Sequence, residues 1–391
     1  MKDCWEYKTL KDIATLITDG DWIESRHQSE DGIRLIQTGN VGDGFFKAKD
    51  DKPHYISEST FAELGCTEIF EGDCLVSRLP EPVGRACIIP DTGSRMITAV
   101  DCSIIRFKDI ILPSLFIYYT RSKRYQQEIY NSTTGTTRKR ISRKNLESIQ
   151  IPVPPLPEQE RIVAELDLLS GIIDKQKAQL GELDILAQSI FYDMFGDPVE
   201  NERGWNIKKL SDIAEGKLSY GSGSTSIPFD GNIRYIRITD IDDNGCLKDE
   251  VVSPNDFNSK YLLNDGDILF ARSGATVGKT YRHRSSNGKC IYAGYLIRLI
   301  PKLEIVNPEY VFGFTKTHYY KSFIALSQKA VAQPNINAEQ YGNLSICVPP
   351  LSLQESFAQR IQSIESQKES INRSIAETQK LFNYTMDKYF G

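Results

Sequence analysis

The hydrophobic pattern divides the chain into two kinds of segment that alternate. Short apolar runs of four to six residues mix β-branched and aromatic residues and are bounded by Gly, Asp or Pro, as β-strands are. Examples are "IRLIQ", "CLVSR" and "SIIRF" in the first half, and "IRYIRI", "DILFAR" and "YLIRLI" in the second. Aromatic stretches near 115–125 and 310–323 are typical of a short helix. We therefore expect mixed but strand-rich bodies.

The remaining segments follow a helical pattern with a narrow apolar seam. Seam positions step by four and three residues alternately, which is the a/d spacing of a coiled coil. The first seam contains Ile162, Leu166, Leu169, Ile173, Gln176, Leu180, Leu183, Ala187, Ile190 and Met194, and the second contains Phe357, Ile361, Ile364, Lys368, Ile371, Ile375, Thr378, Phe382, Thr385 and Tyr389. Each helix would be roughly 57 Å long. The matching seams predict that the helices pair with each other; the alternative is that each folds onto its own body.

A run of prolines precedes each helical segment. The two joints read "IPVPPLPEQE" at 151–160 and "ICVPPLSLQE" at 346–355. Proline cannot extend a helix backward, so each joint is expected to be stiff and extended. Pro157 suits the first position of the first helix, whereas Ser352 and Glu355 predict a capping box for the second.

The two halves of the chain resemble each other. "WEYKTLKDIATLITDG" from Trp5 matches "WNIKKLSDIAEGKLSYG" from Trp205, an offset of about 200 residues that becomes 195 at the second proline joint. This tandem duplication predicts an α+β fold with two mixed, strand-rich domains and two long helices that form an antiparallel coiled coil with pseudo-twofold symmetry. The expected boundaries are 1–155 for the first domain, 156–197 for the first helix, 198–350 for the second domain and 351–391 for the second helix.

Composition narrows the class of protein. The chain of 391 residues carries a net charge of −5, and its eight cysteines contain no C-x-x-C pair, so they are expected to be reduced and mostly structural. The amino terminus is polar and no stretch approaches the length of a membrane span, which predicts a cytoplasmic protein without a membrane partner.

Basic residues are clustered despite the acidic balance. Five of the seven residues from Arg138 to Lys144 are basic, and "VGKTYRHR" at 277–284 forms a second cluster. Such clusters can neutralise phosphates, although a solvated loop and a charged strand end would look the same.

Motifs for catalysis are missing. The sequence has no phosphate-binding G-x-x-x-x-G-K-[ST] loop, no H-E-x-x-H, no G-x-S-x-G and no Asn-Pro-Pro-aromatic motif. Its four histidines have no metal-ligand spacing. We expect neither catalytic residues nor a metal site.

The conjunction of these features resembles a known family. A proline joint followed by "EQERI", a segment "GDILFARSGATVGK", and the repetition of the whole arrangement with long helices are similar to the specificity subunit of type I restriction-modification systems. The resemblance covers essentially the full chain. Two departures are "SLQESFAQRI" at the second joint and "SRLPEPVGRA", which lacks a glycine present in its counterpart.

The resemblance implies a function and a set of partners. Each body would be a target recognition domain that reads one half of a split double-stranded DNA site, and the helices would act as a spacer on which two methyltransferase subunits dock. Restriction and translocase subunits would complete the complex. S-adenosylmethionine, ATP and Mg would belong to those partners, with no cofactor in this chain. Because the two bodies differ, the two half-sites should differ.

Candidate DNA-contacting residues lie in loops that correspond in the internal alignment. Base reading requires forked donors and amides, while Lys and hydroxyl groups suit phosphates. The candidates are Arg78, Arg85, Thr136, Thr137, Arg138, Lys139 and Arg140 in the first body, and Arg272, Ser273, Lys279, Tyr281, Gln333 and Asn335 in the second. The alternative for an arginine such as Arg272 is an ion pair with Asp265 or Asp267.

Two other functions remain open. The chain could be a coiled-coil scaffold or adaptor whose duplicated domains bind ligands other than DNA, or a hydrolase or transferase with an unlisted active site. A steep fall of DNA affinity with salt would indicate phosphate contacts and separate recognition from scaffolding.

Overall fold

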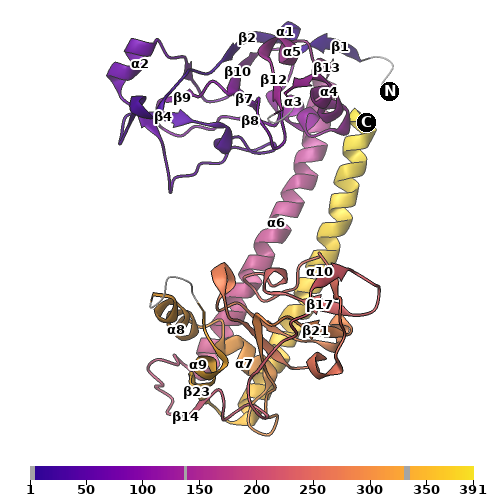
Figure 1. Ribbon diagram of the computed structural model, residues 1–391. Helices are drawn as coiled ribbons and strands as arrows, with labels where there is room; N and C mark the ends of the chain where they lie inside the picture. Colours follow the sequence, from indigo (N-terminus) through magenta and orange to yellow (C-terminus); the bar gives the residue numbers. More distant parts are fainter. Residues whose placement is uncertain (1–4, 136–138, 330–334) are drawn as a thin grey trace. The chain divides into compact units, whose positions relative to one another are not determined.

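The computed structural model describes residues 5–135, 139–329 and 335–391. The chain forms two compact units (Figure 1). The first contains Met1–Gln176 and Ser374–Gly391, and the second contains Lys177–Arg373. Each unit therefore combines a body with one part of each long helix.

The first unit is built on two sheets. One sheet has the strand order β2-β10-β7-β8 with antiparallel pairing, and the other has the order β3-β5-β4-β9-β6 with a parallel β4-β9 pair. Strand β1 pairs with β13, which connects the start of the body to the proline joint. The strands are β1 (Glu6–Thr9), β2 (Ala14–Asp19), β3 (Gln28–Ser29), β4 (Ile33–Ile36), β5 (Tyr55–Ile56), β6 (Glu68–Ile69), β7 (Cys74–Ser77), β8 (Ala86–Ile88), β9 (Met96–Thr98), β10 (Cys102–Phe107), β11 (Thr133–Thr134), β12 (Arg140–Ile141) and β13 (Gln150–Val153).

The second unit repeats this topology. The order β15-β22-β19-β20 corresponds to the first antiparallel sheet, the parallel pair β17-β21 corresponds to β4-β9, and β14-β23 corresponds to β1-β13. The predicted duplication and mixed, strand-rich bodies are confirmed. The strands are β14 (Asn206–Lys209), β15 (Ser219–Tyr220), β16 (Ser226–Pro228), β17 (Arg234–Ile236), β18 (Val252–Pro254), β19 (Ile268–Ala271), β20 (Thr280–Arg282), β21 (Cys290–Tyr292), β22 (Leu296–Leu299) and β23 (Ser345–Val348).

Each aromatic stretch forms two short helices, where the sequence predicted one. The polar residues Ser122 and Thr317 lie at the breaks, and the side-chain oxygen of each accepts a hydrogen bond from a backbone N–H of the following helix. The short helices are α1 (Leu10–Ile13), α2 (Glu58–Leu64), α3 (Pro113–Thr120), α4 (Lys123–Ser132), α5 (Arg143–Glu147), α7 (Pro308–Phe314), α8 (His318–Lys329) and α9 (Ala338–Gly342).

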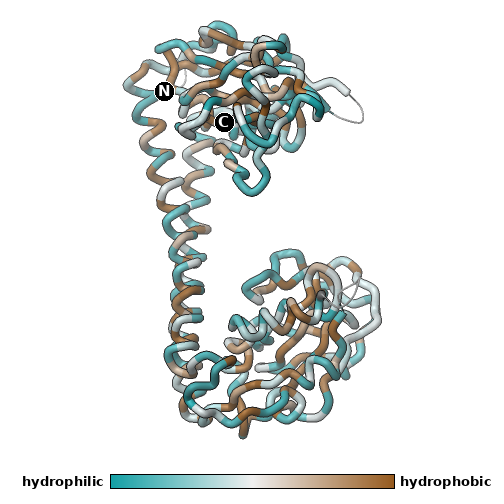
Figure 2. Tube along the Cα trace, turned by 90° about the vertical axis from the view of Figure 1, so that its left-hand side faces the viewer, coloured by the Kyte–Doolittle hydropathy of each residue, from teal (hydrophilic) through white to brown (hydrophobic). Residues whose placement is uncertain are grey.

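The two long helices, α6 (Leu156–Phe195) and α10 (Leu351–Phe390), are continuous. Every described seam position is buried or half-buried, and Figure 2 shows hydrophobic and hydrophilic residues alternating along both helices. The predicted seams are therefore confirmed.

The helices pair in antiparallel fashion within each unit. In the first unit, Arg161 donates to the Tyr389 hydroxyl at 3.0 Å, and Gln176 donates to the Ser374 hydroxyl at 2.7 Å. The contacts thus move backward along α10 as they move forward along α6. Phe382 of α10 belongs to the core of the first unit, so the alternative in which each helix folds onto its own body is wrong.

A buried glutamine fixes each proline joint to its body. Gln159 accepts a hydrogen bond from the Leu112 N–H at 2.8 Å, and its amide donates to the carbonyls of Ile110 and Pro154. Gln354 makes the same set of bonds to Asn307, Ile305 and Pro349. Both side chains are fully buried.

The capping box predicted at Ser352 is wrong. Helix α10 begins at Leu351, so Ser352 lies inside the first turn rather than at the N-cap position. The joint is held by Gln354, whose bonds reach the segment before α7 instead of the helix's own first turn.

We expect Gln354→Ala to destabilise the second unit by about 3 kcal/mol, because it leaves one buried N–H and two buried carbonyls without their partner. Gln362→Ala, an exposed position on the same helix, is the control and should change stability by less than about 0.5 kcal/mol. Urea unfolding measures the free energy of unfolding of both variants. If Gln354→Ala were as stable as Gln362→Ala, Gln354 would not hold the joint.

Candidate nucleic-acid interface

In the first unit, the loop after β7 meets the strand β12. The Ile141 N–H donates to the Arg78 carbonyl at 3.3 Å, and the Arg78 N–H donates to the Asp101 carbonyl at 2.9 Å. Arg78 and Arg140, two predicted site residues, are thereby brought together with acidic residues that the sequence prediction did not include. Arg78 forms an ion pair with Asp19 at 3.1 Å, and Arg140 forms one with Asp101 at 3.1 Å.

The same backbone arrangement recurs in the second unit. The Ile336 N–H donates to the Arg272 carbonyl at 2.9 Å, and the Arg272 N–H donates to the Tyr295 carbonyl at 3.0 Å. Arg272 also donates from Nε to the Asn335 side-chain oxygen at 3.2 Å, and its guanidinium lies 4.7 Å from the centre of the Tyr220 ring. The predicted correspondence of these loops therefore agrees with the backbone bonds.

In each unit, a glycine at the end of a strand allows that strand to lie close to a neighbouring loop. A Cβ at Gly20 would lie 2.4 Å from the Ala99 carbonyl oxygen, and one at Gly221 would lie 2.3 Å from that of Ala293. A larger residue at either position would push β2 or β15 away from the neighbouring loop. These glycines directly follow Asp19 and Tyr220, so they fix where those two side chains lie.

We call this repeated arrangement the four-residue frame. It consists of Asp19, Arg78, Asp101 and Arg140 in the first unit, and of Tyr220, Arg272, Tyr295 and Asn335 in the second. The backbone is shared but the chemistry differs. The first frame pairs two arginines with two carboxylates, whereas the second has one arginine, an amide and two tyrosines that are 41% and 62% exposed.

The exposed groups of both frames are of the kind that read base edges. In the first frame, Arg140 and Asp101 retain 42% and 32% of their side-chain exposure. An arginine can donate a pair of bonds to guanine and a carboxylate can accept from cytosine, while an asparagine amide matches adenine. Tyrosine faces can stack on bases, and the cation–π contact holds Arg272 in place.

Several candidates lie inside the protein. Arg85 is buried and donates to four backbone carbonyls, those of Thr38, Val41, Leu79 and Pro82. Tyr281 is buried beside His283 and Asn287, and burial is the main cause that raises its pKa. These bonds occupy both side chains inside the body, so we do not retain either as a DNA contact.

Arg78 is also mostly buried, which distinguishes it from its partner Arg140. Its guanidinium donates to the Val100 carbonyl at 2.6 Å in addition to the ion pair with Asp19. Burial lowers its pKa, while Asp19 raises it and Arg140 lowers it further. We assign Arg78 to positioning the frame.

The remaining candidates are distributed around the frames. Lys279 pairs with Asp243 at 2.9 Å, and the Lys139 ammonium lies 3.7 Å from the centre of the Tyr130 ring. Ser273 forms an isolated bridge with Asn335. Thr136, Thr137, Arg138 and Gln333 lie outside the described residues.

The alternative for Arg272, an ion pair with Asp265 or Asp267, is not observed. Asp267 pairs instead with Arg298 at 2.5 Å, and Asp265 lies 3.9 Å from Arg282. Arg272 is therefore directed toward Tyr220 and Asn335 rather than toward the acidic residues of its own body.

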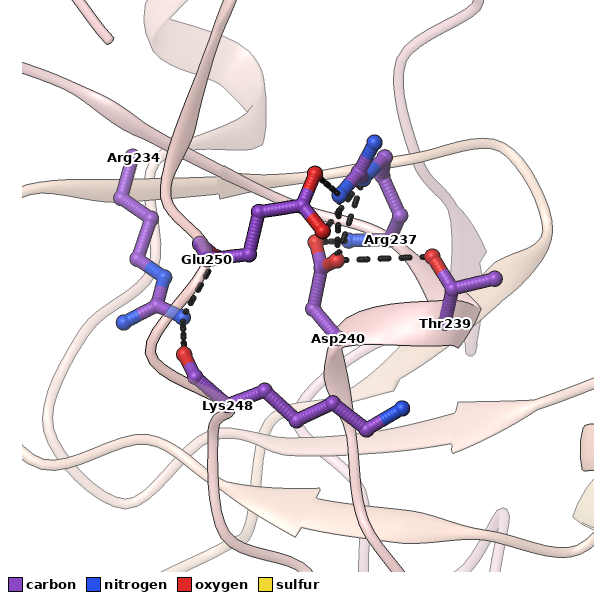
Figure 3. A network of polar contacts seen from close by, with 6 residues as sticks. All are labelled: Arg234, Arg237, Thr239, Asp240, Lys248 and Glu250. Carbon is purple, nitrogen blue, oxygen red and sulfur yellow. Dashed lines mark hydrogen bonds and ion pairs between the residues drawn. The ribbon is translucent and has the colours of Figure 1, made fainter. Parts of the chain in front are cut away.

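A separate polar network holds the loop that follows β17 (Figure 3). Arg237 pairs with Asp240 at 2.7 Å and with Glu250 at 3.2 Å, and Arg234 donates to the Lys248 carbonyl at 2.5 Å. Both arginines are thus used in folding this loop, which separates them in role from Arg272.

The described ranges contain neither a metal centre nor a membrane span. Over residues 5–135, 139–329 and 335–391, no group of three or more His, Cys, Asp or Glu side chains could hold a metal ion. Within the same ranges, no helix is both long and apolar enough to cross a membrane.

Comparison with known proteins identifies the family. The family model for the type I restriction modification DNA specificity domain matches residues 2–183 and 202–380, one match for each repeat. The MjaVIII specificity subunit of a type I restriction enzyme from Methanocaldococcus jannaschii is 25% identical over 291 residues, which cover 66% of this chain and 65% of that protein. The EcoKI specificity subunit of Escherichia coli is 22% identical, and the match covers 74% of this chain and 67% of the relative.

Solved structures agree in fold. A chain from a study of complex assembly and conformational transition of a type I restriction-modification system has a TM-score of 0.59 at 18% identity, with 99% of this chain and 97% of that chain covered. The S subunit of such a system from M. genitalium has a TM-score of 0.56 at 15% identity, covering 99% and 96%. With two matched domains, repeated sheets and a pair of long helices, this chain belongs to the type I restriction-modification DNA specificity family, as a specificity subunit.

Proposed function

We propose that this chain is the DNA-recognition subunit of a type I restriction-modification complex and that each unit reads one half of a bipartite, asymmetric site. One observation carries the proposal: the same backbone frame is built twice, and the two copies carry different side chains, each of a kind suited to contacting bases. A protein that reads two different sequences requires a common scaffold with divergent contact groups. A scaffold that binds no DNA would not require forked donors and amides at equivalent exposed positions.

A salt titration of the complex tests DNA contact itself. Because phosphate contacts release counterions, the logarithm of the affinity should fall linearly with the logarithm of salt concentration, with a slope near −0.9 for each contact. A nearly flat dependence would favour the scaffold function instead.

We propose that methyltransferase subunits dock on the long helices. Leu168 and Ile172 are 65% and 37% exposed and lie one turn apart on α6, so they share a face. Exposed apolar side chains at helical spacing suit a protein interface. Two such subunits and the restriction subunits would supply S-adenosylmethionine, ATP and Mg, and the chain would have no catalytic role of its own.

The double variant Leu168→Glu with Ile172→Glu should abolish copurification of the methyltransferase subunit, because it places two charges in an apolar interface. The stability of the isolated chain should change little, since both positions face solvent. Lys177→Glu makes the same change in net charge at an exposed position on the opposite side of the same helix, and it provides the control. Unchanged copurification by the double variant would show that this face of α6 is not the docking surface.

A further inference from the structure

The second unit contains a pocket of about 260 Å³ at the junction of α7 with α6 and α10. Its apolar wall is formed by Ala187, Phe191, Phe312, Phe357 and Ile361. Charged side chains line much of the rest of the pocket. A pocket of this size with aromatic rings in one wall can enclose one six-membered ring with a short substituent.

The first unit fills the corresponding place with its own side chains. At the offset of 195 residues, Ala187 corresponds to Phe382 and Lys316 corresponds to Arg121. The Phe382 ring packs at 6.2 Å from the Tyr118 ring, and the Arg121 guanidinium lies 5.1 Å above Phe382. An aromatic ring beneath a cation is therefore the packing that this arrangement of helices accommodates.

The second unit replaces only part of this packing. Gly313 corresponds to Tyr118, and Phe357 and Phe191 lie 3.0 and 3.1 Å from where its Cβ would be, so they take up the space of the missing tyrosine. Ala187 leaves the place of the Phe382 ring open, and this position lines the pocket.

Most charged groups around the pocket already have partners. The pairs are Glu309 with Arg282 and Arg284 at 3.0 and 2.9 Å, Lys368 with Asp184 and Glu365 at 2.5 and 3.0 Å, and Asp243 with Lys279 at 2.9 Å. Within the described parts of the chain, Lys316 has no carboxylate within 4.0 Å; its ammonium lies 4.6 Å from the centre of the Phe312 ring. Burial lowers the pKa of Lys316 to about 8, with Asp242 and Asp184 acting in the opposite direction.

We propose that this pocket binds a small aromatic acid, with its ring in the place that Phe382 fills in the other unit and its carboxylate at Lys316. The ring would replace water against Phe191 and Phe357. The carboxylate would supply the ion-pair partner that Lys316 lacks. This site is independent of the proposed DNA contacts, because none of the frame residues lines it.

Isothermal titration calorimetry of the full chain with phenylacetate tests the proposal. Saturable binding at one site is expected, and the neutral analogue phenylacetamide should bind about tenfold more weakly because it lacks the charge. Ala187→Phe should remove binding by filling the pocket with the chain's own ring, as Phe382 does. Lys316→Met should weaken phenylacetate about tenfold and leave phenylacetamide unchanged.

Two control variants keep the result interpretable. Leu186→Phe adds the same ring at an adjacent exposed position outside the pocket, and Lys177→Met removes an exposed ammonium from α6; both should bind phenylacetate like the wild type. Absence of saturable binding to the wild type would overturn the proposal. Unchanged binding by Ala187→Phe would also overturn it. If Ala187→Phe unfolds, the affinity of Lys316→Met for phenylacetate, compared with that of the wild type, decides the question.

Discussion

Replacing Arg272 and Asn335 together with alanine should relax recognition at one half of the DNA site and leave the other half intact. The second frame would lose the guanidinium held over Tyr220 and the amide bonded to it. A well-placed pair of bonds to a base contributes about 1–3 kcal/mol of discrimination, or roughly 5- to 160-fold. Preferred sites selected from a randomised duplex library by the assembled complex provide the measurement.

The duplicated frame supplies a matched control for this experiment. Arg140→Ala removes the exposed arginine of the first frame, so it should relax the opposite half-site. Opposite effects of the two variants would assign one frame to each half-site. If both variants relaxed the same half-site, or neither relaxed any, the frames would not be the base-reading groups.

Lengthening both long helices by seven residues should lengthen the unread gap between the half-sites by about three base pairs. An insertion of one heptad after Gln176 and another after Ile371 retains the a/d phase of the seam and adds about 10 Å of helix. That length corresponds to about three base pairs of duplex DNA. The half-site sequences should not change, because the frames are untouched.

Affinity for DNA should fall in the lengthened protein. Three base pairs rotate the duplex by about a third of a turn, whereas a heptad barely rotates a helix. Inserting the heptad into only one of the two helices would shift the pairing register of the seam. This variant shows how a misfolded helix pair behaves and serves as the control. An unchanged gap would show that the helices do not set the spacing.

The long helices could be predicted from sequence because their signal is local. Each seam position contacts neighbours fixed by helical spacing, so residues from Ile162 to Met194 follow one rule. The proline joints were located for the same reason. The prediction of a capping box at Ser352 was wrong. The joint is held instead by Gln354, which bonds to a segment 47 residues away, and the local sequence gives no sign of so distant a partner.

The frames were only partly predictable. Arg272 and Asn335 were identified because basic and amide residues recur at matched positions in the two halves. Tyr220 and Tyr295 were missed because Tyr220 ends β15 whereas Tyr295 lies in the turn before β22, and only the pairing of these two strands brings them to the same edge. Comparing "ITDG" with "LSYG" shows the divergence of Asp19 and Tyr220, but the sequence alone does not indicate that these positions face Arg78 and Arg272.

Burial explains the candidates that were not retained. Arg85 follows Gly84 in the loop between β7 and β8 and looks exposed by composition, yet it bonds to carbonyls from segments up to 47 residues distant. An arginine whose five donors can satisfy several carbonyls at once is well suited to hold loops together inside a body. Its type therefore does not distinguish a structural role from DNA contact.

Mapping modified bases across a genome that expresses this chain with its methyltransferase tests the central claim most directly. Long-read sequencing should find methylation at a single motif made of two different sequences separated by a fixed gap, and deletion of this chain should remove it. A continuous palindrome as the only modified motif, or methylation that persists without this chain, would contradict recognition by two unlike units.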